Sequence, residues 1–267
     1  MGLPEARMTD KFLDFGNMEQ YTSQSFTLTA GECNAQGLMP VGRLVERVIV
    51  VATEHANRLG IGYARLNPMG IAWVLSRVSV EMKRWPGIND MYSLTTWIEG
   101  FTRFYSDRCF RIDDGQGNAI GYVRTVWVAI DIAKRAVAEL GEIADPAIVN
   151  HELVCPVPKQ GRIRPVAVAD ATKVEEYTFR FSDIDFNRHV NSVRYIEHIL
   201  NMWPMEFYDR WCPEVFEITY AHECLFGQTV TLAALETQTD SGTPDAVVDI
   251  LANNTRAVAA HLRFRPF

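Results

Sequence analysis

The sequence has few cysteines, no long apolar run and no excess of basic residues, and each absence excludes a class of protein. Its five cysteines are odd in number and scattered along 267 residues, which excludes a disulfide framework and a zinc-finger spacing and favours a reducing, cytoplasmic location. No apolar stretch approaches the roughly 18 residues of a membrane helix, so we expect no membrane span. The 26 basic residues are outnumbered by 33 acidic ones, and the net charge of −7 argues against a nucleic-acid partner.

The first 20 residues lack both the apolar core of a secretory signal and the acid-poor composition of a transit peptide. Four acidic residues interrupt this segment, namely Glu5, Asp10, Asp14 and Glu19. Gly2 does not fit N-myristoylation, because that motif needs Ser or Thr where this chain has Ala6. We therefore expect a form without a transit peptide.

What is present describes a globular chain of one large domain or two small ones, with 48% apolar, 22% charged and 11% aromatic residues. Apolar residues recur at helical spacing over residues 41–59, just before Gly60, which predicts a helix with one buried face. Residues 77–83 alternate strictly between apolar and polar, which predicts a half-buried strand. Further β-rich runs follow at residues 91–101, 104–112 and 119–130, the last two joined by turn-forming residues.

A proline-rich, basic stretch at residues 146–169 predicts a linker, and the same order of elements returns after it. We expect a strand at 173–181, a helix at 192–203 and strands at 215–224, 229–235, 246–251 and 257–264. When residues 26–49 are laid over 177–200, an offset of 151, helix falls on helix and strand on strand, although only three residues are identical. This pattern favours a duplicated α+β fold, with one long helix on an antiparallel sheet in each half.

The densest polar cluster precedes the second predicted helix. Asp185, Asn187 and His189 are spaced by two, so in an extended chain they point to the same side. A histidine and a carboxylate at a helix N-terminus can move protons, and we expect backbone amides of residues 190–192 to stabilise an oxyanion. The alternative is that these residues only cap the helix and form a turn. Asn191 fits an N-cap better than a catalytic role, and Asp183 fits a loop-shaping one.

Three stretches of the chain carry a resemblance. Residues 185–196, DFNRHVNSVRYI, resemble the D-x-N-x-H-V-N-N-x-x-Y-I signature of the acyl-acyl-carrier-protein thioesterases. Residues 73–86, WVLSRVSVEMKRWP, are similar to the W-V-x-S/T-R and R-Y/W-P segment of that family's first half, and residues 220–224, YAHEC, to its Y-R-R-E-C segment. The stretches stand in the family's order, and the resemblance covers roughly residues 20–265.

The resemblance implies a tandem hotdog fold, with a first half at residues 20–145 that selects the acyl chain, a linker at 146–169 and a catalytic half at 170–267. It also implies hydrolysis of the thioester between a fatty acyl group and the phosphopantetheine arm of acyl carrier protein, which ends fatty acid synthesis and needs no cofactor or metal. The family's catalytic set falls on Asp185, Asn187, His189 and Glu223. At the offset of 151, the first half has Asn34, Gln36 and Leu38 opposite the first three. One active site per chain is therefore expected.

For the reaction we expect Glu223, alone or with Asp185, to activate water, His189 to orient the water or transfer its proton, and Asn187 to fix the geometry. Spacing leaves open which carboxylate is the base and whether Asp185 attacks the thioester directly. Cys224 occupies the place of a cysteine once assigned as the nucleophile. Because the adjacent Glu223 would disfavour a thiolate, we expect Cys224 to line the substrate site instead.

The resemblance further implies that the first half forms the acyl-chain tunnel. Candidate lining residues are Met69, Trp73, Val78 and Met82, with an ordinary place in the core as the alternative. Acyl carrier proteins are acidic, so a local basic patch must receive one on this net-negative chain. The candidates are Arg43, Arg47, Lys159, Arg162 and Arg164, and a solvated surface is the alternative for each.

Competing interpretations remain at this point. An acyl-CoA thioesterase shares the fold and the reaction and differs only in the carrier, whereas a catalytically silent hotdog would bind acyl chains without cleaving them. A hotdog dehydratase fits less well, because the match is to the thioesterase string. The sequence leaves open the preferred chain length and whether the protein is a monomer or a homodimer.

Overall fold

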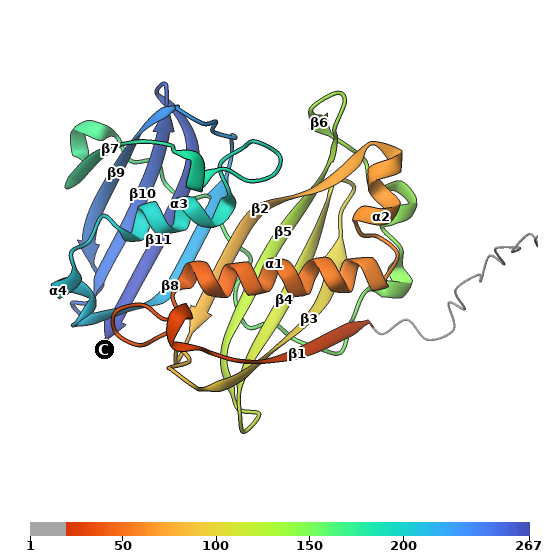
Figure 1. Ribbon diagram of the computed structural model, residues 1–267, viewed down its shortest axis with the longest axis horizontal. Helices are drawn as coiled ribbons and strands as arrows, with labels where there is room; N and C mark the ends of the chain where they lie inside the picture. The colour runs from red at the N-terminus through yellow and green to blue at the C-terminus, as the bar shows by residue number, and fades with distance from the viewer. Residues whose placement is uncertain (1–19) are drawn as a thin grey trace, which may run out of the picture.

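The computed structural model describes residues 20–267, so the predictions about the N-terminal segment concern residues that lie outside the described part. Its strands form one continuous antiparallel sheet in the order β1-β3-β4-β5-β2-β8-β11-β10-β9-β7, with the short β6 paired to β5 (Figure 1). The strands are β1 (Tyr21–Thr27), β2 (Ile71–Met82), β3 (Met91–Phe101), β4 (Tyr105–Asp114), β5 (Ala119–Asp131), β6 (Ala136–Val137), β7 (Lys173–Thr178), β8 (Trp211–Tyr220), β9 (Thr229–Gln238), β10 (Pro244–Ala252) and β11 (Thr255–Pro266). The helices are α1 (Val41–Arg58), α2 (Tyr63–Leu66), α3 (Ser192–Leu200) and α4 (Met205–Tyr208).

The first predicted helix is confirmed as α1, whose apolar face is buried along its length. Its end follows from local chemistry, because Gly60 adopts a left-handed φ of 70° that an ordinary residue disfavours. The second helix, α3, begins at Ser192 as predicted but ends at Leu200, three residues early. The side chain of Asn191 accepts a hydrogen bond from the Val193 N–H at 2.9 Å, which confirms it as the N-cap.

The predicted strands are confirmed, and their bounds differ from the expected ones by one to six residues at all but β3. β2 begins at Ile71, six residues before the alternating stretch, and Val78 and Met82 are buried on its helix-facing side. β8 ends at Tyr220 rather than at residue 224, because the next two N–H groups, of Ala221 and His222, both donate to the Ala257 carbonyl and the chain then leaves the sheet. This departure carries residues 223–226 away from the sheet and towards the loop before α3.

The internal duplication is visible in the register of the elements. α3 begins 151 residues after α1, and the two 3-10 turns Ala30–Glu32 and Phe181–Asp183 keep the same offset. β9 begins 138 residues after β3. β2 and β8 pair in the middle of the sheet, with Val78 opposite Ile218 and Val80 opposite Phe216, so the two halves are related by an approximate two-fold axis there.

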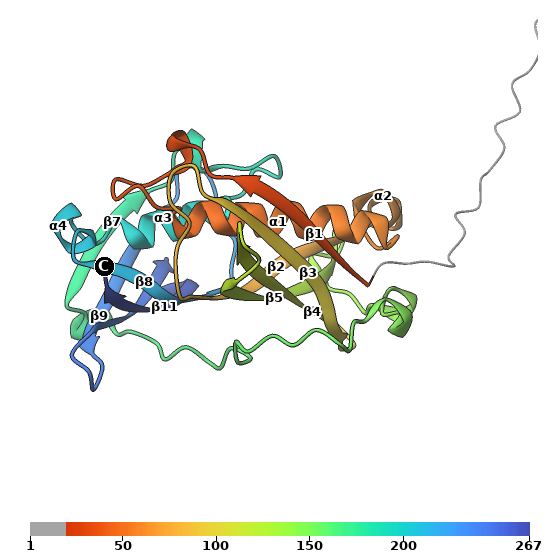
Figure 2. The same ribbon diagram turned by 90° about the horizontal axis from the view of Figure 1, so that it is seen from below.

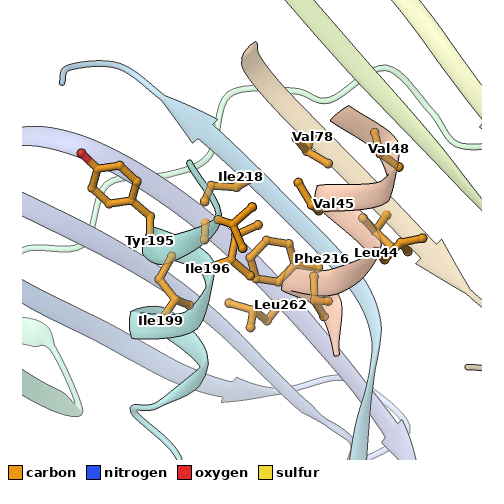
Figure 3. Close-up of a cluster of buried hydrophobic side chains, with 14 of the residues drawn as sticks. Leu44, Val45, Val48, Val78, Tyr195, Ile196, Ile199, Phe216, Ile218 and Leu262 are labelled. Carbon is orange, nitrogen blue, oxygen red and sulfur yellow. The ribbon is translucent and has the colours of Figure 1, made fainter. Parts of the chain in front are cut away.

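Both helices lie on one face of the sheet and share its main core (Figure 1). The labelled side chains in Figure 3 come from α1, α3 and the strands β2, β8 and β11, which shows one apolar cluster bridging the halves. The helices approach closely at Gly42, where a Cβ atom would stand 3.1 Å from a methyl group of Val193. These two residues are equivalent at the offset of 151, so glycine at one of them allows the crossing.

The segment between β6 and β7 crosses the other face of the sheet, opposite the helices (Figure 2). The carbonyls of Val157 and Gln160 accept hydrogen bonds from Arg124 and Arg77. Further hydrogen bonds tie residues 163–166 to Arg256 and Asp249, so the stretch expected to be a linker is held against the sheet from residue 157 to residue 166. No helix within residues 20–267 is both long and apolar enough to span a membrane.

Candidate active site

The loop before α3 is organised by Asp185. Its Oδ1 accepts hydrogen bonds from the N–H groups of Asn187 at 2.8 Å and His189 at 3.2 Å, and its own N–H donates to the His189 carbonyl at 2.8 Å. Arg188 closes the turn with a left-handed φ of 67°. One oxygen of the Asp185 carboxylate therefore holds the loop, which confirms the turn-forming interpretation for that oxygen.

The first half contains the same loop with other side chains. Asn34 Oδ1 accepts hydrogen bonds from the Gln36 N–H at 3.1 Å and the Leu38 N–H at 3.0 Å, and the Asn34 N–H donates to the Leu38 carbonyl at 2.8 Å. Gly37, with φ of 74°, stands where the second half has an arginine. The loop geometry is thus a property of the repeat, whereas the imidazole of His189 belongs to the second copy alone.

Glu223 meets His189 where the chain leaves β8. The Nε2 atom of His189 lies 3.4 Å from Oε2 of Glu223, and the two segments are tied by a backbone bridge between His189 and Leu225. The histidine is about a quarter exposed and the carboxylate 43% exposed, so both groups are open to solvent. At the offset of 138, the first half has the buried Trp85 opposite Glu223. At these two loop positions, within residues 20–267, the second half therefore has an imidazole and a carboxylate where the first half has neither.

A further residue reaches this pair from the other half. The guanidinium of Arg135, in the turn between β5 and β6, lies 2.6 Å from Oε2 of Glu223. Sequence reasoning missed it, because residue 135 is 88 positions away and stands in an ordinary turn of charged residues. The turn is unusual only in that Arg135 has a left-handed φ of 52°. A residue of the first half therefore completes the charge pattern around Glu223.

The expectation for the backbone amides is wrong at two of three positions. The Val190 N–H donates to the Cys224 carbonyl at 2.9 Å and the Asn191 N–H to the Asp183 carbonyl at 2.8 Å, so neither is free to bind an oxyanion. The Val190 N–H bridges the two loops, and the Asn191 N–H closes the loop before α3 on itself. Asn187 is exposed and stands two residues before His189.

Cys224 is fully buried in the main core, and its backbone N–H donates to the hydroxyl of Tyr195 at 3.1 Å. Burial raises the pKa of its thiol, which disfavours the thiolate that a nucleophile needs. The structure agrees with the expectation that the Cys224 thiolate is disfavoured. The cause is burial of the thiol rather than the charge of the adjacent Glu223.

Beneath the loop, Asp183 is buried and accepts three hydrogen bonds. They come from the Tyr177 hydroxyl at 3.0 Å, the Arg180 N–H at 2.7 Å and the ring of His198 at 3.1 Å. Burial raises the pKa of the Asp183 carboxyl, but these three hydrogen bonds outweigh it and hold the pKa below its usual value. The structure confirms the loop-shaping interpretation of Asp183 and adds the partners that the sequence did not reveal.

Two family models match this chain, one over each half. Residues 19–146 match the model of the acyl-ACP thioesterase N-terminal domain, and residues 167–265 match that of the C-terminal domain. The chain belongs to the acyl-ACP thioesterase family. A structure of an acyl-ACP thioesterase from Bacteroides thetaiotaomicron is 30% identical, with a TM-score of 0.84 over 92% of this chain and 98% of that one. The fold is thus a tandem hotdog, as predicted.

Plant members of the acyl-ACP thioesterase family are more distant. The chloroplastic palmitoyl-acyl carrier protein thioesterase of Gossypium hirsutum is 27% identical over 84% of this chain, and this chain spans 57% of that protein's length. The 12:0-ACP thioesterase of Umbellularia californica is 15% identical and covers 95% of this chain and 96% of its own, with a TM-score of 0.85, which shows the shared fold.

The four residues expected to line the acyl chain lie in different parts of the structure. Val78 and Met82 are buried in the main core, whereas Trp73 is half-buried in a second cluster and donates to the Ile61 carbonyl at 2.8 Å. Met69 is 58% exposed on a 3-10 turn. The four residues therefore do not form one continuous surface.

The expected docking cations are mostly engaged. Arg43 and Arg47 pair with Glu46 and Glu32, each at 2.6 Å, and Lys159 pairs with Asp107 at 2.6 Å. The remaining two, Arg162 and Arg164, are exposed on the segment that crosses the far face of the sheet. The part of the chain that the structure describes contains no group of three or more His, Cys, Asp or Glu residues arranged to hold a metal ion.

Proposed function

We propose that this protein hydrolyses the thioester that joins a fatty acyl group to acyl carrier protein, releasing the free fatty acid and ending chain elongation. The observation that carries the proposal is the pair of His189 and Glu223, 3.4 Å apart at Nε2 and Oε2 and open to solvent. The same backbone in the first half has Leu38 and Trp85 at these places. If the pair served only to stabilise the fold, we would expect it in both halves of the chain.

In the proposed reaction, Oε2 of Glu223 accepts a proton from a water molecule, whose oxygen attacks the thioester carbonyl carbon. The C–O bond forms, the carbonyl oxygen becomes negatively charged, and the C–S bond then breaks to release a thiolate. His189, within reach of Glu223, carries the proton to the departing sulfur. The products are a fatty acid and the free thiol of the carrier, so atoms and charges balance.

Asp185 and Asn187 take supporting roles in this proposal. Asp185 uses Oδ1 to hold the loop, as its counterpart Asn34 does in the first half, and we assign it a positioning role rather than that of base or nucleophile. Asn187 is exposed, stands two residues before His189 in the same loop, and is the candidate donor to the developing oxyanion. Its amide takes over the function first expected of the backbone N–H groups at residues 190 and 191.

The carrier is proposed to be acyl carrier protein because relatives from Gossypium hirsutum and Arabidopsis thaliana are named as acyl carrier protein thioesterases. We further propose that the first half, residues 20–145, receives the acyl chain and that residues 170–267 perform the chemistry. A cytoplasmic location is part of the proposal, since all five cysteines are free thiols.

Thiol release from matched panels of acyl-carrier-protein and acyl-CoA thioesters, over a range of chain lengths, tests the proposal. Wild type should prefer the carrier-protein panel by kcat/KM, and His189→Ala should lose activity on both. Preference for the CoA panel would reassign the carrier, and hydrolysis of neither panel would leave an acyl-binding protein. Asn201→Ala, a substitution at the far end of α3, serves as the control for handling and folding.

A further inference from the structure

Four large apolar side chains stand exposed on the two loops that carry His189 and Glu223. They are Phe181 (87% exposed), Phe186 (86%), Leu225 (53%) and Phe226 (67%). Exposed apolar side chains gathered in one place mark interaction surfaces more often than scattered ones do. The four flank the pair of His189 and Glu223 in sequence, two on each loop.

The two loops form one surface. The Val190 N–H donates to the Cys224 carbonyl at 2.9 Å, and the Gly227 N–H donates to the Phe179 carbonyl at 2.9 Å. A backbone bridge joins His189 to Leu225 between these two bonds. Residues 180–189 and 222–227 therefore lie side by side, and we call them together the site rim.

The repeat supplies an internal control for the site rim. At two of the three aromatic positions of the rim the first half has a small side chain, with Ala30 opposite Phe181 and Ala35 opposite Phe186. The third, Phe226, stands opposite Ile88, which is exposed but not aromatic. Gly87 stands opposite Leu225. Since the smaller residues support the same loop geometry, the fold does not require the exposed rings. Their presence in the catalytic copy calls for a role outside folding.

Two arginines of the site rim follow the same rule. Arg180 stands opposite Thr29 and Arg188 opposite Gly37, and both arginines are exposed. Neither guanidinium makes an ion pair within residues 20–267. Arg188 keeps a left-handed φ of 67°, a conformation that favours the glycine of the first half. The second half thus keeps an arginine at a position whose backbone conformation favours glycine.

We infer that the site rim is the docking surface for acyl carrier protein, with Phe181, Phe186 and Phe226 packing against the carrier and Arg180 and Arg188 meeting its acidic side chains. This inference rests on the proposed function. The unpaired cations give the charge complementarity for an acidic partner, and the same two loops carry His189 and Glu223, which the carrier's acyl arm must reach. Arg43, Arg47 and Lys159, in contrast, already pair with carboxylates of this chain.

The test replaces rim residues by those of the first half, which the loop is known to accept. The triple variant Phe181→Ala, Phe186→Ala, Arg188→Gly is compared with wild type on an acyl-carrier-protein thioester and on the S-acyl pantetheine of the same chain. We expect KM for the carrier-protein substrate to rise at least tenfold, with kcat for both substrates and KM for acyl-pantetheine within twofold of wild type. Ile88→Ala, at the exposed first-half counterpart of Phe226, is the matched control and should change nothing.

Salt should raise KM of the wild type for the carrier-protein substrate and affect Arg188→Gly less, because one screened contact is missing. Equal losses on both substrates, no loss on either, or a loss produced only by Arg162→Gln and Arg164→Gln would overturn the inference. So would wild-type binding to phosphatidylglycerol vesicles that the triple variant lacks, because the rim would then be a membrane surface. If wild type hydrolyses neither substrate, the proposed function fails, and titration with acyl carrier protein alone still decides the docking surface.

Discussion

Arg135 and Glu223 form an ion pair across the two halves of the chain, with 2.6 Å between a guanidinium nitrogen and Oε2. The same oxygen faces Nε2 of His189 at 3.4 Å. The arginine comes from a turn of the first half and the carboxylate from the end of β8. The site of the second half is therefore not built by that half alone.

We expect Arg135→Ala to lower kcat on acyl-pantetheine by about tenfold, because the Glu223 carboxylate loses the contact that fixes its orientation toward His189. Arg135→Lys should restore part of the loss, since it keeps a cation at that place. The control is Lys134→Ala, in the same turn, whose ammonium pairs with Asp131 at 2.9 Å instead of the site. A rise in KM confined to carrier-protein substrates would show that Arg135 contacts the carrier instead.

Cys224→Ala should keep most of the activity, whereas Glu223→Gln should reduce kcat by about 10²–10⁴, the usual contribution of a general base. The structural reason is that the Cys224 thiol is fully buried and its pKa is raised. Steady-state rates with matched protein concentrations decide the matter. Collapse of activity in Cys224→Ala, with a retained melting temperature, would reverse this assignment.

Asp183→Asn should destabilise the protein by about 2 kcal/mol in denaturant unfolding, because the amide cannot accept all three hydrogen bonds made by the buried carboxylate. The pKa of Asp183 is lowered in the folded state, so this stabilisation is present above the ordinary pKa of an aspartate and is lost as the pH falls through the lower folded value. The difference between wild type and variant should therefore shrink in acid. A difference that is constant from pH 7 to pH 3 would contradict this account.

His261 gives the opposite pH dependence. Hydrogen bonds from its ring to Asp245 and Glu217 raise its pKa to about 9. The stabilisation is therefore fully present below about pH 6.5 and is lost as the pH rises through 9. At pH 6 the free energy of unfolding of His261→Gln should be about 2 kcal/mol lower than that of wild type. By pH 10 the two free energies of unfolding should be equal. Equal gaps at both values would show that packing on β11, rather than charge, accounts for the loss.

The sequence predicted the repeat and the Asp185 loop because both follow from local patterns. The offset of 151 placed α3 and the Asp185 loop correctly, since helix starts and Asx turns depend on a few neighbouring residues. The extent of β8 could not be predicted in this way. Its first residues include Pro213, which cannot donate to a ladder, and the pairing with β11 shifts register there. Arg135 stayed hidden because only the packing of the two halves brings it to Glu223.

The Asn34 loop has a consequence for engineering. It reproduces the hydrogen bonds of the Asp185 loop without an imidazole, and its partner position holds Trp85 instead of a carboxylate. The protein thus carries an unused copy of its own scaffold, already folded and related to the working one by an approximate two-fold axis. Leu38 and Trp85 are the first positions to change for a chain with two reaction centres, where the two acyl chains would have to enter from opposite ends of the same sheet.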